Sequence, residues 1–295
     1  MAASSLKQQL LLLKSKISTV TALALLSISF GACNDQQPPA MSTDQIVKYP
    51  GKNELILMTD RAPQLETSLR VFREDITPNG SFFIRWHLSQ ILTRIDADTF
   101  RLYISGAVNK ELALSLTDLK TKFTPDSMIA LAVCAGNSRS TFDPKVPGTQ
   151  WKNGAMGNAK WKGVRLKDIL AMAGLKPAAV DVSFQGLDKG ALPGIPAFVK
   201  SLSVDRSLNG EVLIAYEMNG EPIPLLNGYP LKLVVPGWYA TYWVGALSNI
   251  TVLENKFMGF WMDKAYRIAD NPRMTEKPDS LAKNTVPLTT ITCTL

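Results

Sequence analysis

A short apolar run that ends at a cysteine constrains this chain more than any other feature. Residues 128–133 (Met-Ile-Ala-Leu-Ala-Val) have the length and composition of a buried strand. The run stops at Cys134-Ala-Gly-Asn-Ser-Arg139, where small residues allow a tight turn and close approach of a ligand. An arginine near a thiol favours the thiolate, which is the form of cysteine that binds metals. The segment therefore predicts a strand that delivers a reactive or metal-binding thiol.

A helix is predicted a little further along the chain. Apolar residues at 166, 169, 170 and 173 follow the i, i+3, i+4, i+7 pattern of an amphipathic helix. Gly174 comes directly after the pattern and provides a stop signal. Elsewhere, short strand-like runs dominate over helical ones, which predicts an α+β fold of mixed sheets with short helices. Residues 69–72 are expected to form a strand and residues 198–202 the start of a short helix.

One histidine, His87, is present in the whole chain. Zinc, copper and non-haem iron sites usually need several imidazoles, so these sites are disfavoured. No Cys-x-x-Cys-His segment for attaching haem is present either. A metal at Cys134 would therefore be held mostly by ligands that the protein does not supply.

Several separated motifs resemble the sulfite oxidase family, which binds a molybdenum cofactor. They include Cys134-Ala-Gly-Asn-Ser-Arg139, the run from Gly154 to Trp161, and the Gly-x-Arg-Leu that starts at Gly163. Arg85-Trp-His87 and the block from Phe260 to Arg267 match in the same order. The similarity is greatest to the periplasmic sulfite dehydrogenases of bacteria, and it runs from about Ser81 to Leu295.

The resemblance implies a role for each matching residue. Cys134 would be the protein ligand of a molybdenum held by molybdopterin. Arg85, Arg139 and Tyr266 would be catalytic and would bind the substrate together with Trp151. The cofactor contacts would come from His87, Cys134, Asp188, Lys232, Thr241, Tyr242 and Trp243. This chain departs from the family pattern at two positions near the pterin, with Gly245 where relatives have lysine and Asn227 where the animal enzymes have histidine.

Other interpretations of these residues remain open from sequence alone. Cys134 could be a structural buried thiol, or could form a disulfide with Cys293 in an oxidising compartment. His87 could be an ordinary hydrogen-bonded histidine. Arg85 and Arg139 could each form a surface ion pair, and Tyr266 could be a core tyrosine.

The N-terminus indicates export. Lys7, Lys14 and Lys16 precede an apolar stretch that is too short to span a membrane and that ends at Gly31-Ala-Cys33. We expect residues 1–33 to be an export signal with lipid on Cys33, or a plain secretion signal. The protein would then be periplasmic or anchored on the outer side of a membrane. No twin-arginine pair is present, although exported enzymes with this cofactor usually carry one.

A polar, proline-bearing linker is expected at residues 34–52, and the oxidoreductase domain at residues 53–295. The immunoglobulin-like dimerisation domain that the family usually carries after this point is expected to be absent. Without residues 1–32, the chain has 29 basic against 25 acidic residues. Such a small excess suits an anionic substrate or an acidic partner, and it does not indicate nucleic-acid binding.

The predicted function is oxidation of sulfite to sulfate, with electrons passed to a separate c-type cytochrome. A first alternative is reduction of methionine sulfoxide or another S- or N-oxide on the same cofactor. A second alternative, from a different class, is a surface lipoprotein that binds small anions without a cofactor. Molybdenum in the purified protein would separate the two enzymes from the lipoprotein.

Overall fold

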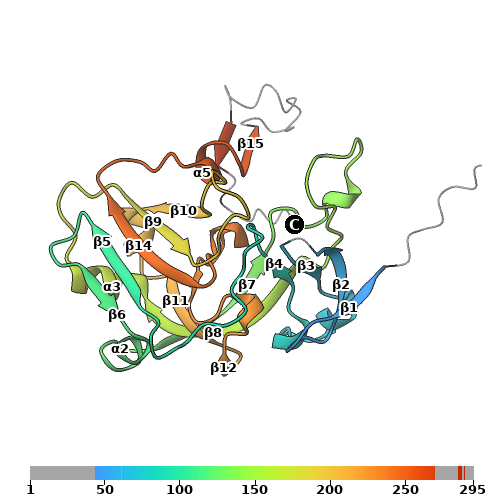
Figure 1. Cartoon of the computed structure of the whole chain (residues 1–295), viewed down its shortest axis with the longest axis horizontal. Coiled ribbons are helices and arrows are strands. Elements are labelled where there is room, and N and C mark those ends of the chain that lie inside the picture. Colours follow the sequence, from blue (N-terminus) through green and yellow to red (C-terminus); the bar gives the residue numbers. More distant parts are fainter. Residues whose placement is uncertain (1–43, 61, 270–284, 288, 290–295) are drawn as a thin grey trace, which may run out of the picture. The chain divides into compact units, whose positions relative to one another are not determined.

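The structure is a computed structural model that describes residues 44–60, 62–269, 285–287 and 289. The predicted export signal, Cys33 and Cys293 lie outside these residues. The chain divides after Asp44, and all elements described below belong to the unit Gln45–Leu295 (Figure 1). In the part of the chain that is described, no helix is long and apolar enough to cross a membrane.

One mixed sheet of five strands has the order β10-β9-β14-β5-β6. Its central strand β14 runs parallel to β5 and antiparallel to β9, and the other pairs are antiparallel. Alternate residues of β5 are buried, as expected for a half-buried strand. The strands are β5 (Leu102–Gly106), β6 (Leu112–Leu114), β9 (Asp181–Gly186), β10 (Val199–Ser203) and β14 (Leu247–Leu253).

A second sheet, entirely antiparallel, has the order β12-β11-β8-β7, and β13 also pairs with β11. The predicted strand before Cys134 is confirmed as β7, which pairs along its whole length with β8. It is an edge strand and is not fully buried as predicted, because Ile129 and Leu131 are exposed. The strands are β7 (Asp126–Val133), β8 (Met156–Arg165), β11 (Leu213–Met218), β12 (Glu221–Pro222) and β13 (Lys232–Val234).

A four-stranded antiparallel sheet precedes both, in the order β1-β2-β3-β4. Because β1 pairs with β2 and Lys52 is only 4% exposed, the predicted linker over 34–52 is too long at its C-terminal end. A two-stranded ribbon, β15 with β16, lies near the C-terminus. The strands are β1 (Ile46–Lys48), β2 (Glu54–Thr59), β3 (Gln64–Glu66), β4 (Ile84–Arg85), β15 (Arg267–Ala269) and β16 (Thr285–Pro287).

The helices are short, as predicted. The α-helices are α2 (Leu116–Thr121), α3 (Leu166–Ala173), α4 (Val204–Leu208) and α5 (Phe260–Asp263). The 3₁₀ helices are η1 (Leu69–Arg73), η2 (Asn79–Ser81), η3 (Arg139–Thr141), η4 (Leu225–Asn227) and η5 (Ala240–Tyr242). Helix α3 has the predicted bounds, buries all four of its patterned apolar positions, and ends at Gly174 with φ +69°. The strand predicted at 69–72 is wrong, since η1 forms there, and the helix start predicted at 198–202 is strand β10.

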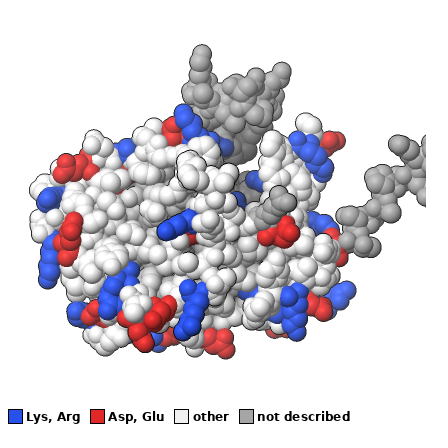
Figure 2. Space-filling model, viewed as in Figure 1, with Lys and Arg blue, Asp and Glu red and all other residues white. Residues whose placement is uncertain are grey.

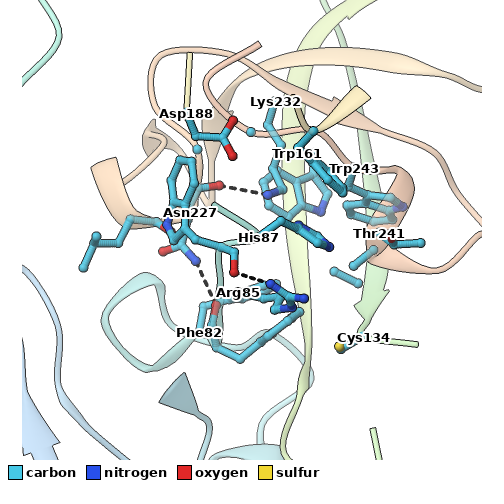
Figure 3. Close-up of a pocket in the computed structure, with 18 of the residues that line it drawn as sticks. Phe82, Arg85, His87, Cys134, Trp161, Asp188, Asn227, Lys232, Thr241 and Trp243 are labelled. Carbon is cyan, nitrogen blue, oxygen red and sulfur yellow. Dashed lines mark hydrogen bonds between the residues drawn. The ribbon is translucent and has the colours of Figure 1, made fainter. Parts of the chain in front are cut away.

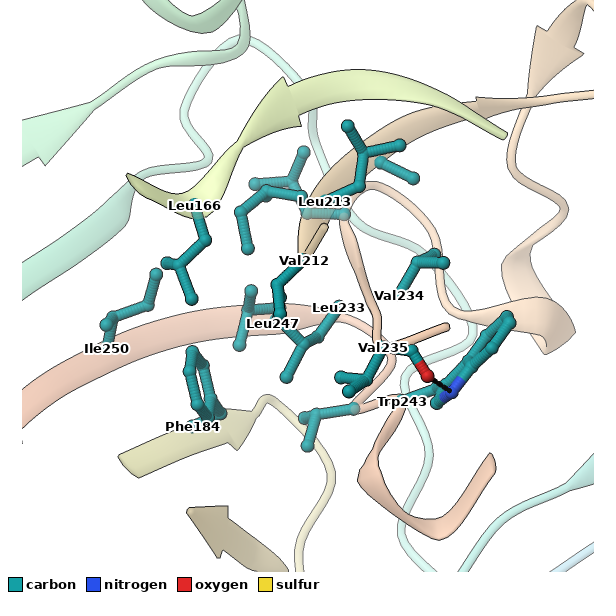
Figure 4. Packing of buried hydrophobic residues seen from close by; sticks show 14 of the residues in the cluster. Leu166, Phe184, Val212, Leu213, Leu233, Val234, Val235, Trp243, Leu247 and Ile250 are labelled. Atoms are coloured by element: carbon teal, nitrogen blue, oxygen red, sulfur yellow. Dashed lines mark hydrogen bonds between the residues drawn. The ribbon is translucent and has the colours of Figure 1, made fainter. Parts of the chain in front are cut away.

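Buried side chains from the two larger sheets meet in one core cluster (Figure 4). Phe184 and Ile250 come from the mixed sheet, Leu213 and Leu233 from the antiparallel sheet, and Leu166 from the start of α3. All five are fully buried, so the core fixes the two sheets against each other. This packing holds the ends of β7 and β13 in place, where the site residues begin. The predicted α+β class is confirmed.

Candidate active site

A cavity opens where several elements end close together (Figure 3). Its walls come from β4, the end of β7, β8, β13 and η5. In Figure 3, Cys134 lies at one end of the cavity and Asp188 with Lys232 at the other.

Cys134 begins the loop directly after β7. Its backbone N–H donates to the Ala155 carbonyl at 2.9 Å, which continues the ladder between β7 and β8 by one residue. The Asn137 side chain accepts from Ala155 N–H at 2.9 Å and closes the loop. The thiol is free and 7% exposed, and it lines the cavity. The predicted strand, turn and thiol are therefore arranged as the sequence indicates.

Opposing effects act on the thiol. Burial raises the pKa of Cys134, whereas Arg85, the Gly136 N–H at 3.4 Å from Sγ and Arg139 each lower it. Burial is the largest effect in the protein alone. A metal cation would favour the thiolate further, because a coordinating thiol is deprotonated outright. The surroundings therefore provide three groups that favour the metal-binding form.

Arg85, His87 and Tyr266 form a hydrogen-bonded cluster beside the thiol. The Arg85 guanidinium donates from Nη2 to the Tyr266 phenol at 3.1 Å and from Nη1 to the Trp86 carbonyl. The same phenol oxygen lies 2.5 Å from Nε2 of His87. The imidazole is stacked on Phe198, with ring centroids 3.6 Å apart and planes 13° apart. Arg85 and His87, at the end of β4, thus both contact the phenol oxygen of Tyr266, which lies 179 positions after His87 in the chain.

The protonation states of this cluster follow from its burial. Burial, assisted by Arg85 and two lysines, lowers the pKa of His87 well below its ordinary value. Burial also raises the pKa of Tyr266, although Arg85 opposes this shift. At neutral pH a neutral imidazole therefore faces a protonated phenol. Because Arg85 can only donate to the phenol oxygen, the phenol O–H stays available for His87 Nε2 or the Thr241 hydroxyl.

The opposite end of the cavity is lined by Lys232, Asn227 and Asp188, and Lys52 contacts it through Asn227. Lys232 Nζ donates to the Asn227 carbonyl at 3.0 Å, and Lys52 Nζ donates to the Asn227 side chain at 2.5 Å. Burial lowers the pKa of Lys232 to about 8 and raises the pKa of Asp188 to about 6. Within the described residues, no ion pair neutralises Lys52 or Lys232. This end therefore suits an anionic group.

Aromatic rings and bare backbone form the remaining walls. Trp161 and Trp243 meet edge to face, with centroids 5.8 Å apart, and line the cavity with Phe82. A side chain at Gly228 would lie 2.7 Å from the Gly245 Cα, so the two backbones touch there. The buried Thr241 hydroxyl also lines the cavity and lies close enough to the Tyr266 phenol to lower its pKa.

Three residues predicted for the site do not line the cavity. Arg139 belongs to the segment that follows Cys134 and donates to the Thr149 carbonyl at 3.2 Å, which supports that segment. Trp151 is 1% exposed and packs against Gly136 of the same loop. Tyr242 is buried behind the wall. Their side chains lie outside the cavity lining, and their predicted contacts with substrate or cofactor stay predictions.

All the other predicted pocket residues line the cavity: Arg85, His87, Cys134, Asp188, Lys232, Thr241, Trp243 and Tyr266. The sequence analysis missed Phe198, which stacks on His87, and two buried lysines, Lys52 and Lys200. The only available signal was a lysine within the apolar run Phe-Val-Lys-Ser-Leu of residues 198–202. Such a lysine is usually read as an exposed strand residue.

Comparison with known proteins shows which family this chain is similar to. Residues 88–261, more than half of the chain, match the family model described as oxidoreductase molybdopterin binding domain. Mitochondrial sulfite oxidase of Rattus norvegicus is 35% identical over 239 residues, which cover 78% of this chain and 43% of the relative. The enzyme of Homo sapiens is 39% identical over 199 residues, which cover 65% of this chain and 36% of the relative.

Among solved structures, the sulfane dehydrogenase SoxCD from Paracoccus pantotrophus superimposes with a TM-score of 0.64 at 24% identity. The match covers 82% of this chain and 60% of that chain, and it shows a shared fold. The chain spans less than half the length of the mitochondrial sulfite oxidases that it matches. The family match and the sequence identity together show that this chain belongs to the sulfite oxidase family of molybdopterin-binding oxidoreductases.

Proposed function

We propose that this chain oxidises sulfite to sulfate with a molybdenum–molybdopterin cofactor and passes the electrons to a separate c-type cytochrome. The observation that carries the proposal is the Arg85 guanidinium, which lies next to the Cys134 thiol and the Tyr266 phenol in one cavity. A positively charged fork beside a metal-binding thiol suits a small oxyanion such as sulfite.

The residues present fit the cofactor. Cys134 offers one buried free thiolate ligand, and no cluster of three or more His, Cys, Asp or Glu side chains occurs in the described ranges. Trp161 and Trp243 offer aromatic walls for a planar ring system, and the Thr241 hydroxyl lines the same cavity. Lys232 and the Asn227 amide lie at the end where an anionic group would be held.

Each protein residue then has a definite task. Cys134 would hold the metal, and His87, Asp188, Lys232, Thr241 and Trp243 would hold the rest of the cofactor. When bound, the cofactor supplies oxygen-atom transfer and a two-electron redox change. Arg85 would bind and orient sulfite, because its guanidinium is fixed by Tyr266 and by the Trp86 carbonyl. Arg139 and Trp151 would hold the Cys134 loop, and Tyr242 would support the wall from behind.

Tyr266 and His87 would position Arg85. The phenol oxygen lies 2.5 Å from Nε2 of His87, whose imidazole is kept neutral by burial and nearby cations. This pair would hold the phenol oxygen against Arg85. Sulfite and water give sulfate, two protons and two electrons, so protons must leave the cavity in each turnover. The electrons would leave singly, which suits two molecules of a one-electron acceptor such as a cytochrome.

The location of the protein is part of the proposal. The apolar segment before Cys33 supports export, with lipid attached to that cysteine or with plain secretion. On the face shown in Figure 2, basic and acidic side chains are interspersed, and no continuous basic band is visible. That surface agrees with a small anionic substrate and does not suggest nucleic acid.

The proposal is tested with protein produced in a host that makes the cofactor. Sulfite-dependent reduction of a c-type cytochrome is measured beside reduction of methionine sulfoxide by a reduced dye. Molybdenum is measured in the same samples. We expect about one molybdenum per chain and activity with sulfite. Activity confined to the sulfoxide would replace the proposal with the reductase, and anion binding without molybdenum would replace it with a lipoprotein that uses no cofactor.

A further inference from the structure

Lys200 is a buried amine that none of the tasks above uses. It lies on β10, where it pairs with Phe184 of β9, and it is 1% exposed. Among the described residues, no carboxylate forms an ion pair with it. Its Nζ instead donates to the Trp261 carbonyl of α5 at 2.7 Å. The amine thus connects a strand of the mixed sheet to the segment that carries Tyr266.

Two tyrosine rings enclose the same amine. Lys200 Nζ lies 4.3 Å from the centroid of the Tyr242 ring and 4.9 Å from the centroid of the Tyr266 ring. Both distances are within the range of cation–π contact. Tyr242 is buried, so its ring is a fixed neighbour of the amine. Lys200 therefore contacts both a fixed ring and the ring whose oxygen contacts Arg85 and His87.

Tyr266 needs such support because its backbone is strained. Its φ is +56°, a left-handed conformation that is unfavourable for a bulky residue. It also follows α5, a helix of only four residues, which gives little local support. A strained conformation of this kind persists only where surrounding contacts fix it. Lys200 contacts both Tyr266 and α5 from a regular strand, β10.

We propose that Lys200 is a positioning residue, which holds Trp261 and the Tyr266 ring so that the phenol oxygen stays between Arg85 and His87. The expected effect on sulfite oxidation rests on the proposed function, whereas the positioning of the Tyr266 ring rests on geometry alone. Burial lowers the pKa of Lys200 to about 7. The charged and the neutral amine can both donate to the Trp261 carbonyl, so this bridge holds in either state.

A lysine with no more than a packing role is the competing explanation. A buried amine without a carboxylate is costly, and an apolar side chain of the same length would be expected to pack at least as well. Lys200→Met keeps the length of the side chain and removes the amine. If Lys200 only filled space, this variant would leave the Tyr266 phenol where it is.

The first test follows the phenol directly. Wild-type protein and Lys200→Met are labelled with tyrosine carrying ¹³C in its ring, and the Tyr266 signal is assigned by its loss in Tyr266→Phe. We expect the Tyr266 signal to shift or broaden in Lys200→Met and to stay unchanged in Lys160→Met, a matched change at an exposed lysine of β8. If Lys200→Met does not fold, Lys200→Gln, which keeps a donor toward Trp261, replaces it.

The second test measures coupling in the loaded enzyme. Lys200→Met is expected to lower kcat/KM for sulfite about tenfold, the effect of about one lost contact of this kind. In a Tyr266→Phe background, the same change is expected to lower it by less than about twofold, because no phenol remains to be positioned. An unchanged Tyr266 signal, or full additivity of the two substitutions, would overturn the inference. Wild-type protein that binds molybdenum but does not oxidise sulfite would refute the proposed function instead, while the NMR test would still decide the role of Lys200.

Discussion

Replacing Arg85 with lysine tests whether the paired donors of the guanidinium matter beyond its positive charge. Arg85 donates to the Tyr266 phenol at 3.1 Å through one nitrogen and to the Trp86 carbonyl through the other, so its orientation is fixed. A lysine keeps the charge near Cys134 but cannot present two parallel donors to an oxyanion. Loss of one charge-assisted hydrogen bond costs about 1.5–3 kcal/mol, which lowers kcat/KM for sulfite about 10- to 150-fold.

The assay compares wild-type protein, Arg85→Lys and Arg94→Lys, a matched control at an exposed arginine. Sulfite-dependent cytochrome reduction is measured from low to saturating sulfite, and molybdenum content is measured on the same samples. Molybdenum is expected to stay at the wild-type level in both variants, since Arg85 is not proposed as a ligand. An Arg85→Lys variant with full molybdenum and kcat/KM within about twofold of wild type would refute the proposed role of the fork.

Three further changes test the cavity and its surroundings. Tyr266→Phe removes the oxygen shared by Arg85 and His87 and is expected to lower kcat/KM for sulfite about tenfold without loss of molybdenum. The control Tyr103→Phe, at a half-exposed ring on β5, should leave both kcat/KM and molybdenum content unchanged. Burial raises the pKa of Asp188 to about 6, so ionisation of this carboxyl destabilises the folded protein as pH rises from about 4 through 6. Asp188→Asn removes that cost. In urea unfolding of cofactor-free protein, the variant should be up to about 3 kcal/mol more stable than wild type at pH 8 and equal to it near pH 3.5. Equal stabilities at pH 8 would contradict that shift. Gly228→Ala would place a Cβ 2.7 Å from the Gly245 Cα at φ +110°, and it is expected to lower the free energy of unfolding by about 3 kcal/mol. The control Gly220→Ala, where φ is +84° and no atom lies within 4 Å, is expected to lower it by about 1 kcal/mol. Similar losses for the two variants in urea unfolding would count against the close contact.

Patterns that are complete within a short segment were predictable. The strand before Cys134 and helix α3 each carry their whole signal in one run of residues, and both formed where expected. The segment 198–202 failed for a physical reason. A five-residue apolar run fits either a strand or one helical turn, and pairing with β9 decides in favour of the strand.

The assembly of the site could not be derived from local patterns. Arg85 and Tyr266 lie 181 positions apart in the chain, and only the family resemblance indicated that they meet. Lys200 escaped notice because lysine is rarely fully buried, so its place under two tyrosine rings has no signal in the sequence. Trp151 and Tyr242 were placed in the pocket by the resemblance alone, and here their side chains pack behind its walls.

The most direct test of the account is the molybdenum content and sulfite activity of Cys134→Ala beside wild-type protein from the same cofactor-making host. The wild type is expected to carry about one molybdenum per chain and to reduce cytochrome when sulfite is added. Cys134→Ala removes the only thiol that lines the cavity within the described residues and is expected to lose that activity while it stays folded. Full sulfite oxidation by Cys134→Ala would contradict the assignment of Cys134 as the metal ligand and, with it, the central claim.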